Sequence, residues 1–216
     1  KNIVQINVNN LRQWTNDRHK TLDDTPYGGG AGMIFKVEPL YECLKEITEN
    51  SSANQRKILL TSPRGKIFSQ KEATRLSLIE DLYIICGHYK GVDERIKSFF
   101  PIEEISIGDY VLSGGEFAAL VIVDPWCHTP RGRVRWFHAY WGDSFTDFLL
   151  DCDYYTRPPI CREKQVPSLL LSGSHDDIKE CRQKPTEEIT EETSPELYHK
   201  YIKEIRETIT SFSMKC

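Results

Sequence analysis

The feature that most constrains the fold is a unit repeated in the first half of the chain: an apolar strand, a loop containing glycine, and a helix. The spacing of apolar residues predicts strands over 3–8, 57–60, 82–86 and 102–107, and helices over 37–48, 69–80 and 116–123. Ser69 and Glu72 have the spacing of a capping box at the start of their helix. Strands that alternate with helices are typical of an α/β domain built on a parallel sheet.

Glycine-containing loops follow three of the expected strands, at residues 61–65, 87–91 and 107–115. The first loop is expected to stop its strand sharply. Parallel sheets bind ligands at the carboxyl ends of their strands, and glycine lets backbone groups approach a ligand closely. Gly65-Lys66 lacks the earlier glycine of a P-loop, and residues 28–32 do not follow an apolar strand as a dinucleotide fingerprint would. The loops therefore predict a pocket without naming its ligand, and any single loop is also explained by an ordinary tight turn.

The composition excludes several classes of protein. The 216 residues suffice for one large domain, or for one domain and a smaller one. Hydrophobic residues make up 39% and charged residues 28%, which excludes wholesale disorder and fibrous structure. No apolar run could span a bilayer, so neither a membrane nor a signal peptide is expected. The net charge of −4 neither predicts nor excludes a nucleic-acid partner.

The cysteines indicate the redox environment. Seven of them are scattered along the chain, and no two have Cys-x-x-Cys spacing. Such a set argues against a disulfide framework or a zinc ribbon and favours a reducing, cytoplasmic location. His19 and His175 are isolated, so no metal site is expected.

Ordered motifs run from about Asn2 to Lys184. The longest are PYGGGAGM at 26–33, CGHYKGVDER at 86–95 and EISIGDYVLSGGE at 104–116, with Ser62-Pro63 between the first two. In this order the motifs resemble the bacterial tRNA (guanine-N1)-methyltransferases, the TrmD family. Several ordered motifs are far more specific than any single glycine pattern.

The resemblance implies an α/β fold of the SPOUT class, in which a parallel sheet contains a deep trefoil knot and a small, mostly helical C-terminal domain follows. It implies a methyltransferase domain over residues 1–134, a linker over 135–143 and the C-terminal domain over 144–216. The match begins at the family's second strand, so the family's first strand–helix unit is expected to be missing. Family members are obligate homodimers, and a homodimer is expected here.

The resemblance also implies an enzyme that transfers a methyl group from S-adenosylmethionine to N1 of the guanosine at position 37 of tRNA, just 3′ of the anticodon. The donor would bind bent within the knot, its adenine held by loop backbone, and the partner's C-terminal domain would help to grip the tRNA. Carried over onto this chain, the donor contacts are Leu60, Thr61, Ser62, Pro63, Gly87, Ile107, Gly108, Asp109, Tyr110, Val111, Leu112, Gly114 and Gly115.

A methyl transfer to guanine N1 needs a base. N1 carries a hydrogen at neutral pH, so a base must remove it while the negative charge that grows on O6 is stabilised. The resemblance assigns this base to Asp143, a carboxylate whose pKa burial would raise toward neutrality. Without the resemblance, Asp143 is better explained as the N-cap of a helix.

Two residues and one segment depart from the family pattern. Lys90 replaces a Glu that contacts the target guanine in the family, and His128 stands where an Arg would polarise O6. Residues 125–142 hold three tryptophans and three arginines but no acid, which fits either an out-of-frame stretch or a nucleic-acid strip with stacking aromatics. The alternative functions are therefore a catalytically impaired relative that binds S-adenosylmethionine or tRNA, and a decayed fragment.

Overall fold

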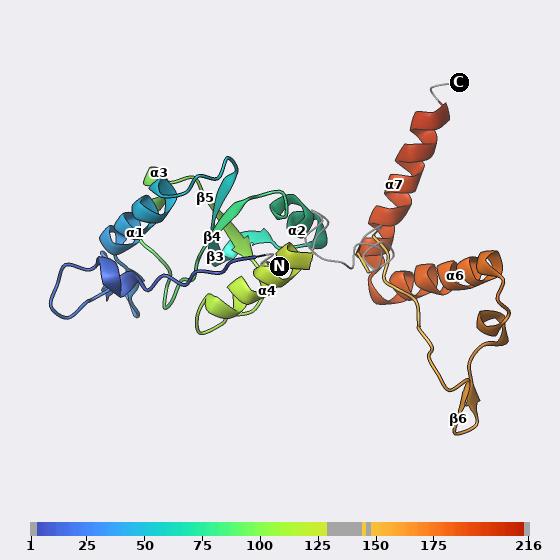
Figure 1. The fold of residues 1–216 in the computed structure, drawn as a ribbon. Coiled ribbons are helices and arrows are strands. Elements are labelled where there is room, and N and C mark those ends of the chain that lie inside the picture. Colours follow the sequence, from blue (N-terminus) through green and yellow to red (C-terminus); the bar gives the residue numbers. More distant parts are fainter. Residues whose placement is uncertain (1–3, 129–143, 146–147, 214–216) are drawn as a thin grey trace. The chain divides into compact units, whose positions relative to one another are not determined.

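A computed structural model gives the fold of residues 4–128, 144–145 and 148–213 (Figure 1). These residues fall into two compact units, one on each side of residues 129–143. The expected linker over 135–143 lies outside the described residues. The division of the chain into domains 1–134 and 144–216 therefore stays a prediction.

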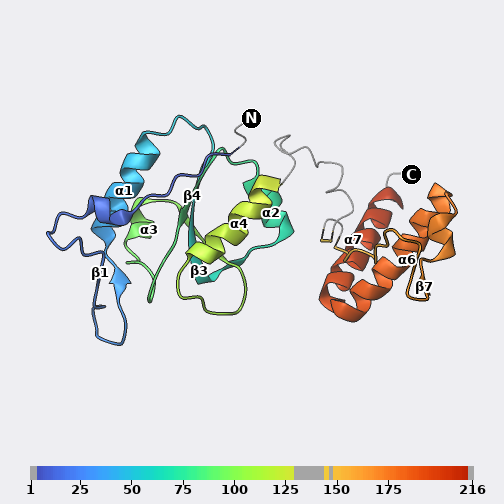
Figure 2. The same cartoon turned by 60° about the horizontal axis from the view of Figure 1, so that its bottom comes forward.

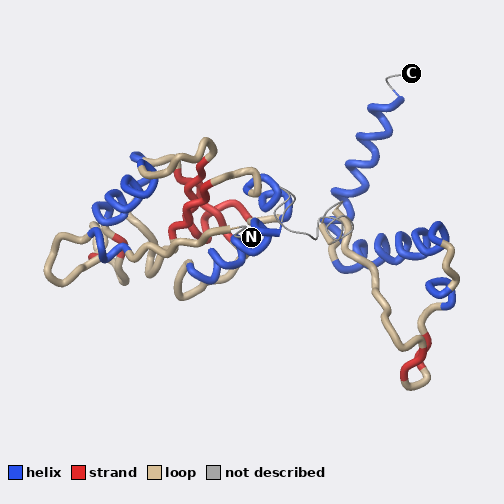
Figure 3. The backbone as a smooth tube through the Cα atoms, in the orientation of Figure 1, coloured by secondary structure: helices blue, strands red, loops and turns tan. Residues whose placement is uncertain are grey.

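The first unit is built on a three-stranded parallel sheet with strand order β4-β3-β5. Its strands are β3 (Arg56–Ile67), β4 (Asp81–Ile85) and β5 (Ile102–Ser106), drawn in red at the centre of that unit in Figure 3. Leu59 of β3 lies opposite Ile84 on one side and Glu103 on the other. The parallel α/β architecture predicted from the alternating strands and helices is confirmed.

Helices cover both faces of this sheet, as the views in Figures 1 and 2 agree. One face carries α1 (Val37–Glu49) and α3 (Ile96–Phe99), and the other carries α2 (Gln70–Leu76) and α4 (Glu116–His128). Successive residues of β3 alternate between the two cores, because side chains along a strand point to opposite faces.

The two cores show this alternation directly. Ile58 and Leu60 pack in the core beneath α1 and α3, whereas Leu59 packs in the core beneath α2 and α4. Leu59 and Ile122 of α4 are fully buried. Burial on both faces explains why Ile58, Leu59 and Leu60 are all apolar rather than alternating with polar residues.

The predicted sharp stop after residue 60 is wrong, because β3 continues to Ile67. Thr61 and Lys66 both lie opposite Ile105 of β5, so residues 62–65 bulge out of the strand between them. A Cβ at Gly65 would lie 2.3 Å from the backbone nitrogen of Ile105. Gly65 is therefore needed because β3 passes very close to β5 at this point, and it does not end the strand.

The strand expected over 3–8 is not formed by its described residues, 4–8. Ile6 and Val8 are 65% and 92% exposed, so their side chains gain little from burial. The 3-10 helix η1 (Leu11–Trp14) follows, and then β1 (Asp23–Asp24) pairs antiparallel with β2 (Ile34–Phe35). An alternating pattern forms a strand only where a partner strand is available.

The other elements agree with the sequence to within a few residues. The helix expected over 37–48 is α1, and the strands expected over 82–86 and 102–107 are β4 and β5. The Ser69 hydroxyl accepts from the backbone nitrogen of Glu72, as the capping box predicts, but α2 ends at Leu76 rather than at residue 80. Conversely, α4 runs through Pro125 to His128, beyond the predicted end at 123.

The second unit is mainly helical. It contains the hairpin β6 (Ile160–Cys161) and β7 (Lys164–Gln165), the 3-10 helix η2 (Ser168–Leu171), and helices α6 (His175–Thr193) and α7 (Pro195–Ser213). The helical character predicted from residue 176 onward is confirmed. Thr190 of α6 is fully buried, and its hydroxyl accepts from the Leu150 backbone at 2.8 Å. None of the helices that the structure describes is long and apolar enough to cross a membrane.

Candidate functional site

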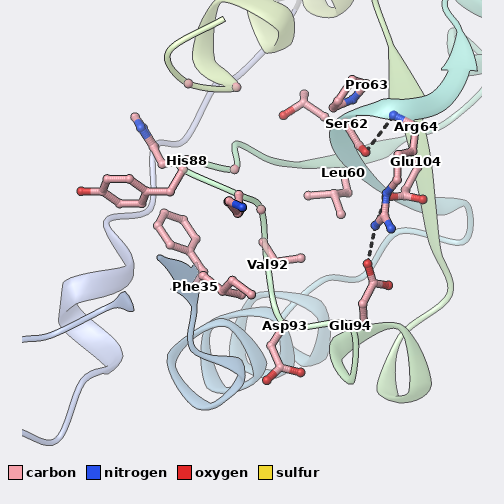
Figure 4. Close-up of a pocket in the computed structure, with 18 of the residues that line it drawn as sticks. Phe35, Leu60, Ser62, Pro63, Arg64, His88, Val92, Asp93, Glu94 and Glu104 are labelled. Carbon is pink, nitrogen blue, oxygen red and sulfur yellow. Dashed lines mark hydrogen bonds and ion pairs between the residues drawn. The ribbon is translucent and has the colours of Figure 1, made fainter. Parts of the chain in front are cut away.

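One cavity lies at the carboxyl ends of the three parallel strands. Its volume is about 960 Å³, and it is lined by the bulged part of β3, by the glycine-containing loops that follow β4 and β5, and by residues 24–27 and 34–38. Figure 4 shows the labelled side chains gathered around this space. The loops that sequence reasoning singled out separately therefore do meet around one site.

Most of the predicted donor-contact residues line this cavity. Those that do are Leu60, Thr61, Ser62, Pro63, Gly87, Ile107, Gly108, Tyr110, Val111, Leu112, Gly114 and Gly115. Asp109 is exposed on the same loop and is not among the lining residues. That these residues bind a methyl donor stays a prediction.

The loops touch through a glycine turn that leaves no room for a side chain. A Cβ at Gly115 would lie 2.1 Å from Thr61 Oγ1 and 2.8 Å from the Cα of Cys86. The Gly115 backbone nitrogen donates to the Gly87 carbonyl at 2.9 Å, and the Thr61 hydroxyl donates to the Ile85 carbonyl at 3.1 Å. Thr61 of β3, the end of β4 and the turn before α4 are thereby fixed against one another.

A histidine–carboxylate pair adds a second connection between two of the loops. Nε2 of His88 lies 2.6 Å from Oε1 of Glu116, and the backbone of His88 bridges to Gly114. Burial raises the pKa of the Glu116 carboxyl, but the hydrogen bond from His88 lowers it, and the net direction is downward. Sequence reasoning missed this pair, since the two residues are 28 positions apart and share no spacing signal.

A network of alternating charges forms another wall of the cavity. The Arg64 guanidinium contacts Glu94 and lies 3.2 Å from Glu104, as Figure 4 displays, and Lys97 lies 2.6 Å from Glu94. Burial raises the pKa of Glu104, but hydrogen bonds led by that from Lys97 lower it below its ordinary value. The sequence analysis did not predict this network, although the run of charged residues at 93–95 is the part of it that the sequence makes visible.

The base predicted for the reaction lies outside the described residues, because Asp143 falls within 129–143. Most of the unusual segment 125–142 is also outside them, and His128 is the last residue of α4. Lys90, by contrast, lines the cavity. Among the residues that the structure describes, no group of three or more His, Cys, Asp or Glu side chains could hold a metal ion.

Comparison with known proteins identifies what this chain resembles. A family model described as "tRNA (Guanine-1)-methyltransferase TrmD" matches residues 1–200. A curated tRNA (guanine-N(1)-)-methyltransferase of Clostridium tetani is 42% identical over 201 residues, which cover 93% of this chain and 82% of the relative. Relatives with the same name from Clostridioides difficile and Geobacter sulfurreducens are 40% and 42% identical over 200 residues, covering 93% of this chain and 87% and 81% of their own.

Proposed function

Because the chain belongs to the tRNA (guanine-1)-methyltransferase family, we infer that it is an enzyme that transfers a methyl group to N1 of a guanosine in tRNA. The target is the guanosine at position 37, just 3′ of the anticodon. The observation that carries this proposal is the cavity at the carboxyl ends of β3, β4 and β5, where the family's motifs come together. A non-catalytic relative and a decayed fragment are less favoured, since the similarity extends over 93% of the chain.

The methyl donor is S-adenosylmethionine, and the residues present fit it. The glycine turn at Gly114-Gly115 offers backbone groups at a point where a Cβ could not be accommodated. Leu60 and Ile107 add apolar lining, and Gly87, Gly108 and Gly114 bring backbone to the wall of the cavity without a side chain in between, as a mostly apolar ligand with polar edges requires. When bound, S-adenosylmethionine supplies a methyl group on a positively charged sulfur, which leaves as a neutral thioether.

The chain itself must handle the proton of guanine N1. Asp143 is the proposed base: its carboxylate accepts the N1 proton, and the electron pair of that N–H bond is then free to attack. The negative charge shared with O6 needs a donor or a cation nearby, and removing one such stabiliser typically costs about 10²–10³ in rate.

Three further features of the family are proposed for this chain. The first is the deep trefoil knot, in keeping with the match of the family model to residues 1–200. The second is a helical C-terminal domain, formed by the second unit, that helps to hold the tRNA. The third is a cytoplasmic location, in keeping with the free thiols of the five described cysteines.

The chain also acts as a homodimer. In the first unit, α4 presents an apolar face formed by Phe117, Leu120 and Val121, all of them exposed, and the neighbouring Val111 is 91% exposed. An apolar patch of this kind on a folded domain is typical of a protein–protein interface. We propose that a second copy of the chain covers this apolar face of α4.

The proposed function is tested by single-turnover transfer of labelled methyl from S-adenosylmethionine to tRNA. We expect transfer to tRNA with guanosine at position 37 and none to a matched tRNA with adenosine there. Asp143→Asn should abolish transfer while donor binding, measured by calorimetry, stays intact. Equal labelling of both tRNAs would contradict the assigned target, and a fully active Asp143→Asn variant would contradict the assigned base.

A further inference from the structure

The side chains of His88 and Glu116 meet over the glycine turn that precedes α4. Nε2 of His88 lies 2.6 Å from Oε1 of Glu116. A Cβ added at Gly114 would lie 2.6 Å from Cε1 of His88 and closer still to Oε2 of Glu116. The imidazole and the carboxylate therefore pack directly on the backbone of Gly114, in space that a side chain at this position would fill.

The pair connects this turn to the loop after β4. His88 belongs to that loop and lines the cavity, whereas Glu116 is the first residue of α4 and is not among the lining residues. Backbone contacts join the same two places, because the Gly115 nitrogen donates to the Gly87 carbonyl at 2.9 Å and His88 forms an isolated bridge with Gly114. The side-chain hydrogen bond thus reinforces a short backbone junction.

Two other side-chain hydrogen bonds of the loop after β5 stay local. The Ser106 hydroxyl donates to the Gly108 carbonyl at 3.2 Å, and the Tyr110 hydroxyl donates to the Ile107 carbonyl at 3.3 Å. Both bonds join residues two or three positions apart, so they cannot fix the turn against the loop after β4. The hydrogen bond between His88 and Glu116 does cross between these two places.

The exposure of the pair indicates that its effect is local. The side chains of His88 and Glu116 are 40% and 57% exposed, and a pair so accessible to water contributes little to global stability. What it can change is the position of the backbone that it covers, and Gly114 and Gly115 both line the cavity. A carboxylate in the first turn of a helix also stabilises that helix on its own, so a test must separate this effect from the effect of the pair.

We propose that His88 and Glu116 are positioning residues for the methyl donor, which hold the Gly114-Gly115 turn against the loop after β4 in the arrangement that binds it. This inference rests on the proposed function, in which the backbone of the turn contacts S-adenosylmethionine. Both side chains act through that backbone, and neither takes part in the proton transfer. Preorganisation of a binding site raises affinity, so loss of the pair should weaken donor binding without slowing the reaction at saturating donor.

The test measures donor affinity by calorimetry and the single-turnover rate at saturating donor and tRNA. His88→Leu leaves the Glu116 carboxylate on the helix and should bind S-adenosylmethionine about fivefold more weakly, the upper end of the range for an exposed pair. His88→Gln should stay within about twofold of the wild type, because its amide N–H can donate to the same carboxylate. The rate at saturating donor should stay within about twofold in both variants.

A double variant and a second ligand show whether the two residues act together and through the turn. His88→Leu combined with Glu116→Ala should bind the donor no more weakly than Glu116→Ala alone, because the effects of interacting residues are not additive. S-adenosylhomocysteine, the product without the positive charge, should lose affinity by the same factor as S-adenosylmethionine, because the pair acts on the turn and not on the sulfonium.

Glu46→Ala is the matched control. The Glu46 carboxylate accepts from Trp14 Nε1 at 2.8 Å, an exposed hydrogen bond between residues 32 positions apart, and neither residue lines the cavity. Its removal should leave donor affinity unchanged. The melting temperature of each variant reports that it folds.

Several outcomes would overturn the assignment. Unchanged donor affinity in His88→Leu would make the pair an ordinary surface contact, and an equal loss in His88→Gln would make the imidazole a direct ligand contact. A larger loss for S-adenosylmethionine than for S-adenosylhomocysteine would show that Glu116 acts by its charge on the sulfonium. A wild type that binds the donor but methylates no tRNA would refute the proposed function and leave the positioning role to the affinity series, whereas a wild type that does not bind the donor would refute both.

Discussion

At the scale of single residues, the cavity depends on positions where only glycine fits, because a Cβ atom would overlap its neighbours. Gly115 is the clearest case, since the space for its Cβ is already taken by Thr61 and by the backbone at Cys86. Gly87 lies beside it but has room, because the atoms nearest to an added Cβ are 3.9 Å away. An added methyl group would therefore clash at Gly115 but would be accommodated at Gly87, although the two glycines lie side by side.

Gly115→Ala should lower both stability and donor affinity. The added methyl must push Thr61 of β3 and the backbone at Cys86 away, and such overpacking typically costs about 1–3 kcal/mol. We expect at least a tenfold weaker affinity for S-adenosylmethionine in calorimetry, on the order of the affinity change that this strain implies, together with a lower melting temperature. Gly87→Ala is the control for stability and should melt close to the wild type. Two variants with the same melting temperature would contradict the steric reading.

At the scale of elements, α2 is tied to the sheet by one buried carboxylate. The Glu72 side chain is 7% exposed, contacts Lys66 of β3, and accepts from Arg75 at 2.8 Å. Arg75 in turn lies 2.7 Å from Glu103 of β5. Burial raises the pKa of Glu72, but the hydrogen bonds from Lys66 and Arg75 lower it by more than burial raises it. The pKa therefore lies below its ordinary value.

Glu72→Gln should destabilise the protein by roughly 1.5–3 kcal/mol at pH 7, the range for hydrogen bonds to charged groups. Because the pKa is lower in the folded state, the stabilisation is present above the unfolded value of about 4.3 and is lost as the pH falls through the folded value. Urea unfolding at several pH values measures this. The difference in the free energy of unfolding between the variant and the wild type should disappear at low pH. The exposed control Glu42→Gln should unfold with the same free energy as the wild type at pH 7. A gap that persists unchanged at low pH would rule out the ion pairs as its cause.

The elements also show which parts of the fold the sequence could predict. Helix α1 and strands β4 and β5 have strong local patterns, and each was predicted to within about two residues. The end of β3 was missed because Gly65 was interpreted as a turn residue, while its role is the close passage beside Ile105. Residues 4–8 alternate like a strand but pair with none of the strands that the structure describes, and partner availability is a tertiary property.

The candidate site also has parts that the sequence could predict and parts that it could not. Its glycine loops were predictable, because strand ends and glycines are local features and parallel strands bring their carboxyl ends to one edge. The His88–Glu116 pair and the Arg64–Glu94–Glu104 network were not, since each joins residues 28 or more positions apart. Long-range ion pairs of this kind depend on the assembled fold and leave no periodic signal.

At the scale of the whole molecule, the question is what covers the apolar face of α4. Phe117 and Leu120 are 64% and 63% exposed, although the opposite side of the same helix buries Ile122 completely. Helix α4 is therefore apolar on more than the side that packs on the sheet, which is typical of a helix with a second partner. Residues 110–112, which shortly precede α4 in the sequence, are also exposed and line the cavity. Association through this face would thus place a second chain next to the site.

Replacing Phe117 and Leu120 by aspartate should convert the proposed dimer into a monomer. Burying two carboxylates without partners costs several kcal/mol, more than enough to dissociate a dimer held by an apolar patch. Light scattering coupled to size exclusion gives the mass directly, and the wild type should run at twice the chain mass of 25.0 kDa. Ile160→Asp, at an exposed apolar position of β6 in the second unit, should remain dimeric. Because Ala118 of the same helix and residues 110–112 before it line the cavity, the monomeric variant should also lose methyl transfer, and a fully active monomer would separate the α4 face from the function of the site.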